Sequence, residues 1–256
     1  MATRLSAGRQ QLIVEIVREQ RTATVEELSD RLGVSEATIR RDLDKLTNDG
    51  AVQRAHGGAI AVQQAEPEPP VLRRVAENAD LKRRIGRAAA ELIEDGDTVF
   101  IGSGTTTIEV ARHLGGTRDL KVITNALNVA NVLAAMPEIT TILVGGVLRN
   151  SEMSMVGHLA EQALADLSAN KVVMGIRALS IERGLSNELG METSMDRAIV
   201  RCAPTLILVA DHTKLGKTAS VTIAPAAAIH TLVTDTLAPA EKVDELRQHG
   251  VQVVLA

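Results

Sequence analysis

Seven short apolar segments constrain the fold of this chain more than any other feature of its sequence. They read TVFIG, KVITN, TTILVGG, KVVMGI, TLILVAD, HTLVTD and VQVVLA, in chain order. Most are unbroken apolar runs rather than alternating ones, as expected for strands of a parallel sheet that is covered on both faces. Helical patterns separate several of them, as over residues 126–136 and 238–248, and a long helix is expected over 75–96. These features predict an open α/β fold with a mostly parallel sheet.

Polar residues follow several of these predicted strands. Ligands of open α/β sheets bind beyond the carboxyl ends of the strands, so these residues are candidates for a binding site. The run GSGTTT at 102–107 has glycines that let the backbone approach an anion, and it precedes a helix whose first N–H groups are free to donate. The candidate set is Gly102, Ser103, Gly104, Thr105, Thr106, Thr107, Thr124, Asn125, Gly145, Gly146, Arg149, Arg177, Asp211 and Lys214.

Each candidate also has a structural explanation when it is taken singly. The glycine-rich run could be a capped turn, Asn125 could cap a helix, and Asp211 could pair with Lys214. Their recurrence at strand ends favours a ligand site. The run lacks the Lys of a Walker loop and the spacing of a dinucleotide fingerprint, so neither ATP nor NAD is expected. No spacing of residues predicts a metal site or a catalytic nucleophile, and no cofactor is predicted.

The first sixty residues carry a different pattern, that of a helix, a tight turn and a second helix. Thr24 and Glu27 have the spacing of a capping box at the start of one helix. Gly33 allows the turn at LGVS, and Ser35 can cap the next helix. The segment AVQRAHGGA then predicts a hairpin wing.

The helix expected over 36–48 has two unlike faces. Ile39, Leu43 and Leu46 share the apolar face, whereas the opposite face carries arginines that suit guanine edges or phosphates. We expect the DNA contacts to be Ser35, Ala37, Thr38, Arg40, Arg41, Lys45, Arg54 and His56. The alternative is a helical dimerisation module with a solvated arginine face, because this segment as a whole is not basic.

Composition narrows the classes of function. The net charge of −4 argues against a non-specific nucleic-acid coat. Phe100 is the only aromatic residue, so there is almost nothing on which single-stranded nucleic acid could stack. The single cysteine, Cys202, excludes an internal disulfide. With no run of about 18 apolar residues and no signal peptide, the sequence predicts a cytoplasmic protein without a membrane span.

The segment TVEELSDRLGVSEATIRRDLDKL, with the RAHGGA that follows it, resembles the winged helix-turn-helix of the DeoR family of transcription regulators. The segments GDTVFIGSGTTT, VITNALNVA, LVGGVLR, GLSNELGMETSMDRAI and LVADHTKLGK resemble the sensor domain of that family. The resemblance covers nearly the whole chain. It implies a sensor fold similar to ribose-5-phosphate isomerase and coenzyme A transferases, and an effector that is a phosphorylated sugar or a related metabolite. Ala178 stands where the family usually has Gly, and its methyl group is expected to narrow or line the pocket.

The sequence thus predicts a winged helix-turn-helix domain over 1–60, a proline-containing linker over 61–74 and an α/β sensor domain over 75–256. A single winged module would bind weakly, so we expect a homo-oligomer on repeated or palindromic half-sites of a double-stranded operator. The resemblance implies a repressor of a sugar-catabolism operon that a phosphorylated sugar releases.

Two alternatives remain at this point. The first is a sugar-phosphate isomerase fused to a DNA-binding module, with Asp211, Glu188 or Glu192 as base and Lys214 as acid. The second is a dimeric DNA-architectural protein, which would leave the polar groups at the strand ends unexplained.

Overall fold

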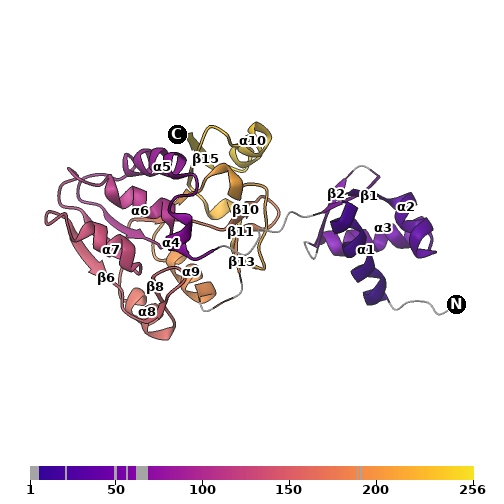
Figure 1. The fold of residues 1–256 in the computed structure, drawn as a ribbon, viewed down its shortest axis with the longest axis horizontal. Coiled ribbons are helices and arrows are strands. Elements are labelled where there is room, and N and C mark those ends of the chain that lie inside the picture. Colours follow the sequence, from indigo (N-terminus) through magenta and orange to yellow (C-terminus); the bar gives the residue numbers. More distant parts are fainter. Residues whose placement is uncertain are drawn as a thin grey trace. The chain divides into compact units, whose positions relative to one another are not determined.

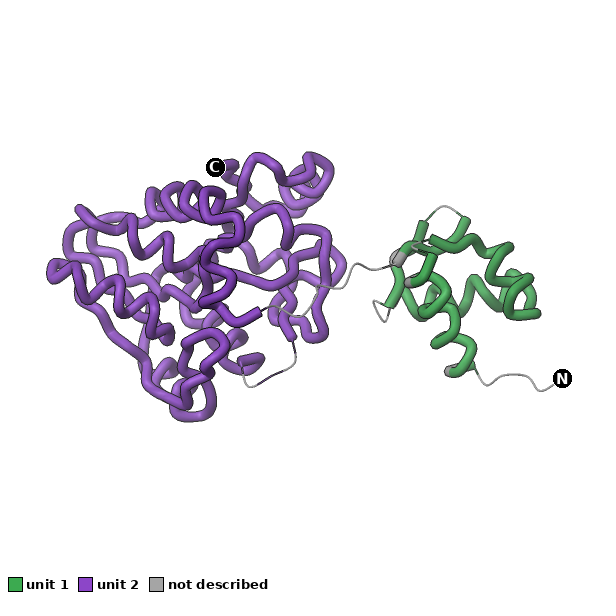
Figure 2. Tube along the Cα trace, in the orientation of Figure 1, with its two compact units in different colours: residues 1–64 green, residues 65–256 purple. Residues whose placement is uncertain are grey.

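A computed structural model of the 256-residue chain describes residues 6–20, 22–48, 51–55, 57–61, 69–188, 190 and 192–256. The chain forms two compact units, residues 1–64 and residues 65–256 (Figure 2). Each unit has an apolar core of its own. Half of the linker expected over 61–74, residues 62–68, lies outside the described residues, and its last residues form the helix α4 (Val71–Arg74) of the second unit.

The described part of the first unit is a winged helix-turn-helix. Its elements are α1 (Ser6–Gln20), β1 (Thr22–Thr24), α2 (Val25–Leu32), α3 (Glu36–Asn48), β2 (Val52–Ala55) and β3 (Gly58–Ala61). The antiparallel hairpin of β2 and β3 confirms the predicted wing, and β1 adds a third strand beside β3. Ile13, Leu28, Ile39 and Leu43 are fully buried between the helices.

The predicted start of α2 is confirmed. The Glu27 backbone N–H donates to Thr24 Oγ1 at 3.1 Å, and the Thr24 backbone N–H donates to Glu27 Oε2 at 2.8 Å. Gly33 then takes a left-handed conformation with φ of 66°, which a residue with a Cβ adopts only at a cost. This turn sets the direction in which α3 leaves α2.

The second unit is built on a seven-stranded sheet in which every neighbouring pair is parallel. The strands in sheet order are β15 (Gln252–Leu255), β14 (Thr231–Thr234), β12 (Thr205–Val209), β9 (Lys171–Met174), β4 (Thr98–Ile101), β5 (Lys121–Thr124) and β6 (Thr140–Leu143). Each of the seven predicted strands is present, so the predicted α/β fold is confirmed.

Helices cover both faces of this sheet (Figure 1). They are α5 (Ala79–Ala90), α6 (Thr105–Arg112) and α7 (Leu127–Leu133) on one face, and α8 (His158–Ala165), α9 (Glu192–Arg201) and α10 (Ala240–Gln248) on the other. Val99 and Ile101 of β4 are buried in the core on the face covered by α5, α6 and α7. Phe100 between them is buried in the core on the face covered by α8, α9 and α10. The strands are unbroken apolar runs because successive side chains enter different cores.

The helix expected over 75–96 is shorter than predicted, because α5 spans only Ala79–Ala90. Asn78, directly before it, has φ of 52°, a left-handed conformation that interrupts the helix. None of the described helices is both long and apolar enough to cross a bilayer.

Short elements that the sequence did not predict surround the carboxyl ends of the strands. They are the hairpin of β7 (Val147–Arg149) and β8 (Ser154–Val156), the small sheet of β10 (Ala178–Ser180), β11 (Gly184–Asn187) and β13 (Val221–Ala224), and the 3-10 turns η1 (His212–Lys214) and η2 (Ala226–Ala228).

Candidate functional site

A cavity of about 190 Å³ lies at the carboxyl ends of the central strands of the second unit. The predicted residues that line it are Gly102, Ser103, Gly104, Thr105, Thr106, Asn125, Arg149, Arg177, Asp211 and Lys214. They come from loops after β4, β5, β9 and β12 and from the β7–β8 hairpin, and parallel strands bring these loops to one edge of the sheet. Each of them therefore stays a candidate contact to a ligand.

The first turn of α6 forms one wall of this cavity. Gly104 precedes the helix with φ of 139°, and Thr105 and Thr106 are buried at the helix start. The first N–H groups of a helix have no acceptor within the helix and favour an anion. This wall has the chemistry of a phosphate site.

Two lysines and one aspartate also line the cavity, Lys82, Lys214 and Asp211. Lys82 is buried and donates from Nζ to the Arg74 carbonyl oxygen at 2.7 Å, and burial lowers the pKa of its ammonium although Asp211 opposes the shift. Burial alone would raise the pKa of Asp211, but hydrogen bonds from Thr213 and the charge of Lys214 outweigh it and lower this pKa. Asp211 therefore stays ionised, and it caps η1.

Two buried side chains that line the cavity have polar atoms without a hydrogen-bond partner among the described residues. They are Oδ1 of Asn125 and both Nε and one Nη of Arg177. Arg177 is only 9% exposed, and its nearest counter-charge is the Glu188 carboxylate, 3.3 Å from Nε. Asn125 Nδ2 donates to the Met155 carbonyl oxygen at 2.9 Å, which fixes the side chain.

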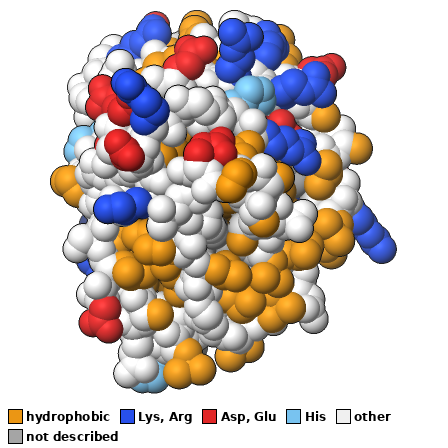
Figure 3. Space-filling model, turned by 90° about the vertical axis from the view of Figure 1, so that its left-hand side faces the viewer, with side chains coloured by type: hydrophobic (Ala, Val, Ile, Leu, Met, Phe, Trp, Pro, Cys, Tyr) orange, Lys and Arg blue, Asp and Glu red, His pale blue; other side chains and the backbone are white. Residues whose placement is uncertain are grey.

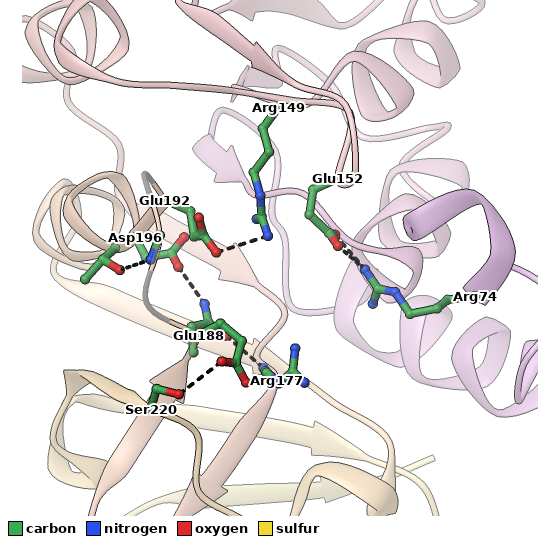
Figure 4. Close-up of polar contacts among 11 residues, drawn as sticks. Arg74, Arg149, Glu152, Arg177, Glu188, Glu192, Asp196 and Ser220 are labelled. Carbon is green, nitrogen blue, oxygen red and sulfur yellow. Dashed lines mark hydrogen bonds and ion pairs between the residues drawn. The ribbon is translucent and has the colours of Figure 1, made fainter. Parts of the chain in front are cut away.

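The opposite wall is rich in carboxylates that pair with cavity arginines or with amides (Figure 4). Glu192 lies 3.0 Å from Arg149, and Asn187 donates from Nδ2 to Asp196 at 2.5 Å. Burial, with a smaller contribution from the neighbouring Glu192, raises the pKa of Asp196 to about 7 against this hydrogen bond. The wall offers hydrogen-bond acceptors to the hydroxyl groups of a ligand.

Four predicted residues lie outside the cavity lining of this structure, and their contact with a ligand stays a prediction. Thr107 Oγ1 donates to the Gly104 carbonyl oxygen at 2.9 Å, and Thr124 Oγ1 donates to the Ile101 carbonyl oxygen at 2.7 Å. Gly146 allows close packing, since a Cβ there would lie 2.9 Å from the Cβ of Ala160, and Gly145 is exposed. These residues shape the loops that carry the site.

Ala178 also lies outside the cavity lining. It is fully buried in β10.

Sequence reasoning missed several cavity residues. They are Arg74, Glu77, Asn78, Lys82, Ser151, Glu152, Ser154, Asn187, Asp196 and Thr213. Most lie on the short elements around the sheet, which carry no strong periodic pattern. Asn78 lies inside the helix expected over 75–96, and its Nδ2 donates to Asp211 at 3.5 Å.

The first unit presents the predicted DNA-reading face on α3. Arg41 and Lys45 are exposed and form no ion pair with a described residue, whereas Arg40 pairs with Glu36 at 2.8 Å. On the wing, Arg54 lies 3.0 Å from Asp44. Ser35 and Ala37 are exposed and Thr38 is partly exposed at the start of α3, and His56 lies outside the described residues.

A buried carboxylate holds this face in place. Asp42 is 4% exposed and accepts hydrogen bonds from Arg9 at 2.6 Å and from Gln10 at 2.8 Å. It points away from Arg41 and fastens α3 to α1, so Asp42 has a structural role within the reading motif.

Comparisons with known proteins match both parts of the chain. The family described as DeoR-like helix-turn-helix domain matches residues 9–65, and the family described as DeoR C terminal sensor domain matches residues 77–236. The HTH-type transcriptional regulator GlpR of Haloferax volcanii is 36% identical over 250 residues, 98% of each chain. The glycerol-3-phosphate regulon repressor of Escherichia coli K12 is 33% identical over 243 residues, 95% of this chain and 96% of that protein.

Among solved structures, ribose 5-phosphate isomerase A of Methanocaldococcus jannaschii matches with a TM-score of 0.41 and 18% identity, over 54% of this chain and 55% of that one.

A DNA-reading unit and a separate ligand-sensing unit in one chain define a transcriptional regulator. The chain belongs to the DeoR family of these regulators. The curated relatives are regulators, which favours regulation over the isomerase alternative.

Proposed function

We propose that the chain acts in the cytoplasm as the repressor of a carbohydrate-catabolism operon and that a small phosphorylated sugar in the cavity releases it from the operator. The relatives support this assignment, because one of them is named as the repressor of a glycerol-3-phosphate regulon. The effector acts by binding more tightly to the state of the protein that does not bind DNA.

The observation that carries the proposal is the pair of unsatisfied groups in the cavity wall, on Arg177 and Asn125. A buried polar group without a hydrogen bond costs about 1–3 kcal/mol, so these groups favour a ligand that can pair with them. Arg177 needs an acceptor and Asn125 Oδ1 needs a donor. A sugar phosphate supplies both, through its oxygens and its hydroxyl groups.

The phosphate group is placed at the start of α6. There the backbone of Gly102, Ser103 and Gly104 leaves room for an anion, and Thr105 and Thr106 donate from their hydroxyls. Lys214 supplies a charge from η1. The hydroxyl groups of the sugar then face the opposite wall, which carries Arg149 and the Glu192 carboxylate paired with it.

DNA binding is assigned to α3 and the wing of two copies of the chain. The proposed contacts are Ser35, Ala37, Thr38, Arg40, Arg41, Lys45, Arg54 and His56. One α3 helix covers few base pairs, so two copies on a palindromic operator supply the affinity that a single copy lacks.

A thermal-shift screen against phosphorylated sugars tests the effector assignment, with the unphosphorylated sugars as matched controls. A compound that raises the unfolding temperature is then added to the complex of the protein with the DNA upstream of its own gene, and release is followed by fluorescence anisotropy. We expect release by a phosphorylated compound and none by its unphosphorylated partner. If a phosphorylated sugar and its unphosphorylated counterpart stabilise the protein equally, the cavity has no phosphate site.

A further inference from the structure

The segment that follows the linker joins the second unit at the wall of the cavity. Residues 62–68 connect β3 to the described residues of this unit, which begin two residues before α4. α4 is only four residues long, from Val71 to Arg74, and only these two of its side chains are buried. A helix this short is not stable by itself in water, so α4 depends on its contacts with the rest of the unit.

Two neighbouring residues of the turn between β7 and β8 hold α4 in place. The Val71 N–H donates to the Ser151 carbonyl oxygen at 2.7 Å. Arg74 donates from one Nη to both carboxylate oxygens of Glu152, at 2.5 and 2.6 Å (Figure 4). We call these two contacts the α4 anchor. Arg74, Ser151 and Glu152 all line the cavity, so the α4 anchor is part of the cavity wall.

The two charges of the α4 anchor are shielded from water. Charged side chains on the surface, such as those in the upper half of the face in Figure 3, are solvated, and their ion pairs contribute little to stability. In contrast, only 10% of the Arg74 side chain and 15% of the Glu152 side chain are exposed. Breaking such a pair leaves a buried charge without its partner, which is costly. An anionic ligand that replaces Glu152 avoids this cost, because Arg74 then stays paired.

The α4 anchor lies near the wall formed by the first turn of α6. α4 lies against α6, and that turn has the chemistry of a phosphate site. Lys82, a buried residue of the cavity lining, donates from Nζ to the Arg74 carbonyl oxygen at 2.7 Å. The cavity therefore holds two cations that attract an anion, Lys82 and Arg74, and both are bonded to α4 or belong to it.

The backbone between α4 and α5 allows α4 to move separately. Asn78 has φ of 52°, a left-handed conformation that Asn tolerates better than most residues, and it divides the two helices. α5 is fixed in the core by Ile85 and Ala89, which are both fully buried. A change in the position of α4 therefore need not disturb α5.

We propose that the effector takes Arg74 from Glu152 and so releases the α4 anchor. Arg74 is then both a contact to the effector and the residue through which effector binding reaches the linker. The state that binds the operator keeps the α4 anchor, and the state that holds the effector lacks it. This inference rests on the proposed function in one respect, that the effector weakens operator binding, and it names the contact that the effector changes.

Glu152→Gln tests the α4 anchor without any effector. The amide keeps the shape of the side chain and removes the charge that holds Arg74, so the variant should behave like the protein with bound effector. We expect its operator affinity, measured by fluorescence anisotropy, to fall on the order of tenfold, within the usual range of coupling between two sites. A purely structural Glu152 would leave the operator affinity of the folded protein unchanged, because the DNA-reading residues lie in the other unit.

Asp95→Asn is the matched control for this variant. Asp95 pairs with Arg118 and lies outside the cavity lining, so its loss of charge should leave operator affinity unchanged. Circular dichroism verifies the fold of both variants.

Hydrogen exchange of the wild type tests the α4 anchor without a variant. The probe is inorganic phosphate, and chloride at matched ionic strength is the control. We expect the amides of residues 71–77, among them the Val71 N–H, to exchange faster in phosphate, because the contacts that protect them are released. The amides of α5 should exchange at the same rate in both solutions. Equal or slower exchange of residues 71–77 in phosphate would overturn the inference.

The outcomes separate this inference from the proposed function. A folded Glu152→Gln variant that binds the operator like the wild type would overturn the role of the α4 anchor and leave the regulator intact. A wild type that binds no operator DNA, but whose residues 71–77 exchange faster in phosphate, would overturn the proposed function and leave the release of the α4 anchor by an anion intact.

Discussion

One guanidinium nitrogen of Arg74 donates to both carboxylate oxygens of Glu152, at 2.5 and 2.6 Å, and so joins α4 to the turn between β7 and β8. Arg74 Nε also donates to the Pro69 carbonyl oxygen at 2.8 Å, and the Val71 N–H donates to the Ser151 carbonyl oxygen at 2.7 Å. Arg74, Ser151 and Glu152 all line the cavity. The first described residues of the second unit are therefore fastened to the wall of the ligand site.

A double-mutant cycle measures this contact. Glu152→Leu leaves the Arg74 charge largely buried without its main partner, so the free energy of unfolding should fall by about 1.5–3 kcal/mol. The Arg74→Leu/Glu152→Leu variant should recover part of this loss, because neither charge of the pair is then left buried without the other. Urea unfolding of the four proteins checks it. The exposed pair of Arg118 and Asp95 serves as the control cycle, with a coupling of about 0–1 kcal/mol. Strict additivity for Arg74 and Glu152 would contradict the expectation.

The reading face is tested at Arg41. Arg41→Ala should weaken specific operator binding by about 1–3 kcal/mol, as expected for an arginine that reads a guanine. Fluorescence anisotropy with operator and scrambled DNA separates specific from general binding. Arg84→Ala, an exposed arginine of α5 in the second unit, is the control and should leave the affinity unchanged. If Arg41→Ala binds the operator like the wild type while its fold is intact, another surface reads the DNA.

The phosphate wall is tested at Thr106. Thr106→Asp places a carboxylate where the phosphate is proposed to bind, so the effector should no longer bind while operator binding persists. The result is a repressor that cannot be induced, measured by operator release on addition of effector. Thr117→Asp, in the loop before β5 at the opposite end of the sheet, is the control.

Thr106 is buried, so a milder variant guards against loss of folding. Thr106→Val keeps the shape and removes the hydroxyl, and it should weaken the effector without abolishing its binding. If both variants are induced normally, the effector phosphate does not bind at the start of α6.

Asp196 should make stability depend on pH. Its folded pKa is raised from 3.8 to about 7, so the folded protein binds a proton that the unfolded chain has released in this window. The contribution of this group to stability is complete below 3.8 and is lost as the pH rises through about 7. Asp196→Asn cannot lose a proton there, so the unfolding temperature of the wild type should fall relative to this variant between about pH 5 and about pH 8.

Thermal unfolding across this range checks the Asp196 prediction, with Asp166→Asn as a control because Asp166 is exposed. A constant difference between wild type and Asp196→Asn over the whole range would mean that Asp196 keeps an ordinary pKa.

The sheet could be predicted from the sequence because the residues of each strand are apolar where both faces of the strand are buried. The run TVFI is apolar at successive positions because Val99 and Phe100 enter cores on opposite faces. The capping box at Thr24 was equally local, with partners three residues apart. Such features need only short-range patterns, and the structure agrees with them.

The cavity could be predicted only in part. Strand ends indicated Asn125, Arg177 and Asp211, because parallel topology brings such ends together. Glu152 could not be found this way, since its partner Arg74 is 78 residues away. Asp196 lies on a helix among residues without a chemical pattern, and its shifted pKa arises from tertiary burial. The hydroxyl of Thr124 donates to the Ile101 carbonyl oxygen, a backbone contact that a sequence does not show.

The last prediction concerns Lys214. The sequence allows two interpretations of this residue, a contact to the ligand or a surface ion pair with Asp211. The structure places both residues in the cavity wall, and Asp211 is 3% exposed. Asp211 also accepts hydrogen bonds from the backbone and hydroxyl of Thr213, so Asp211→Asn would disturb η1 as well as the ligand. Lys214→Met is the cleaner test, because it removes the charge and keeps most of the apolar stem.

If Lys214 faces the effector phosphate, Lys214→Met should weaken effector binding by about 1.5–3 kcal/mol, typical of a hydrogen bond to a charged group. Operator affinity without effector should not change, because the DNA-reading residues lie in the other unit. Lys217→Met is the matched control, since Lys217 lies three residues further on and does not line the cavity. Isothermal titration with the effector from the screen compares the three proteins. Wild-type effector affinity in Lys214→Met would show that this lysine does not contact the effector.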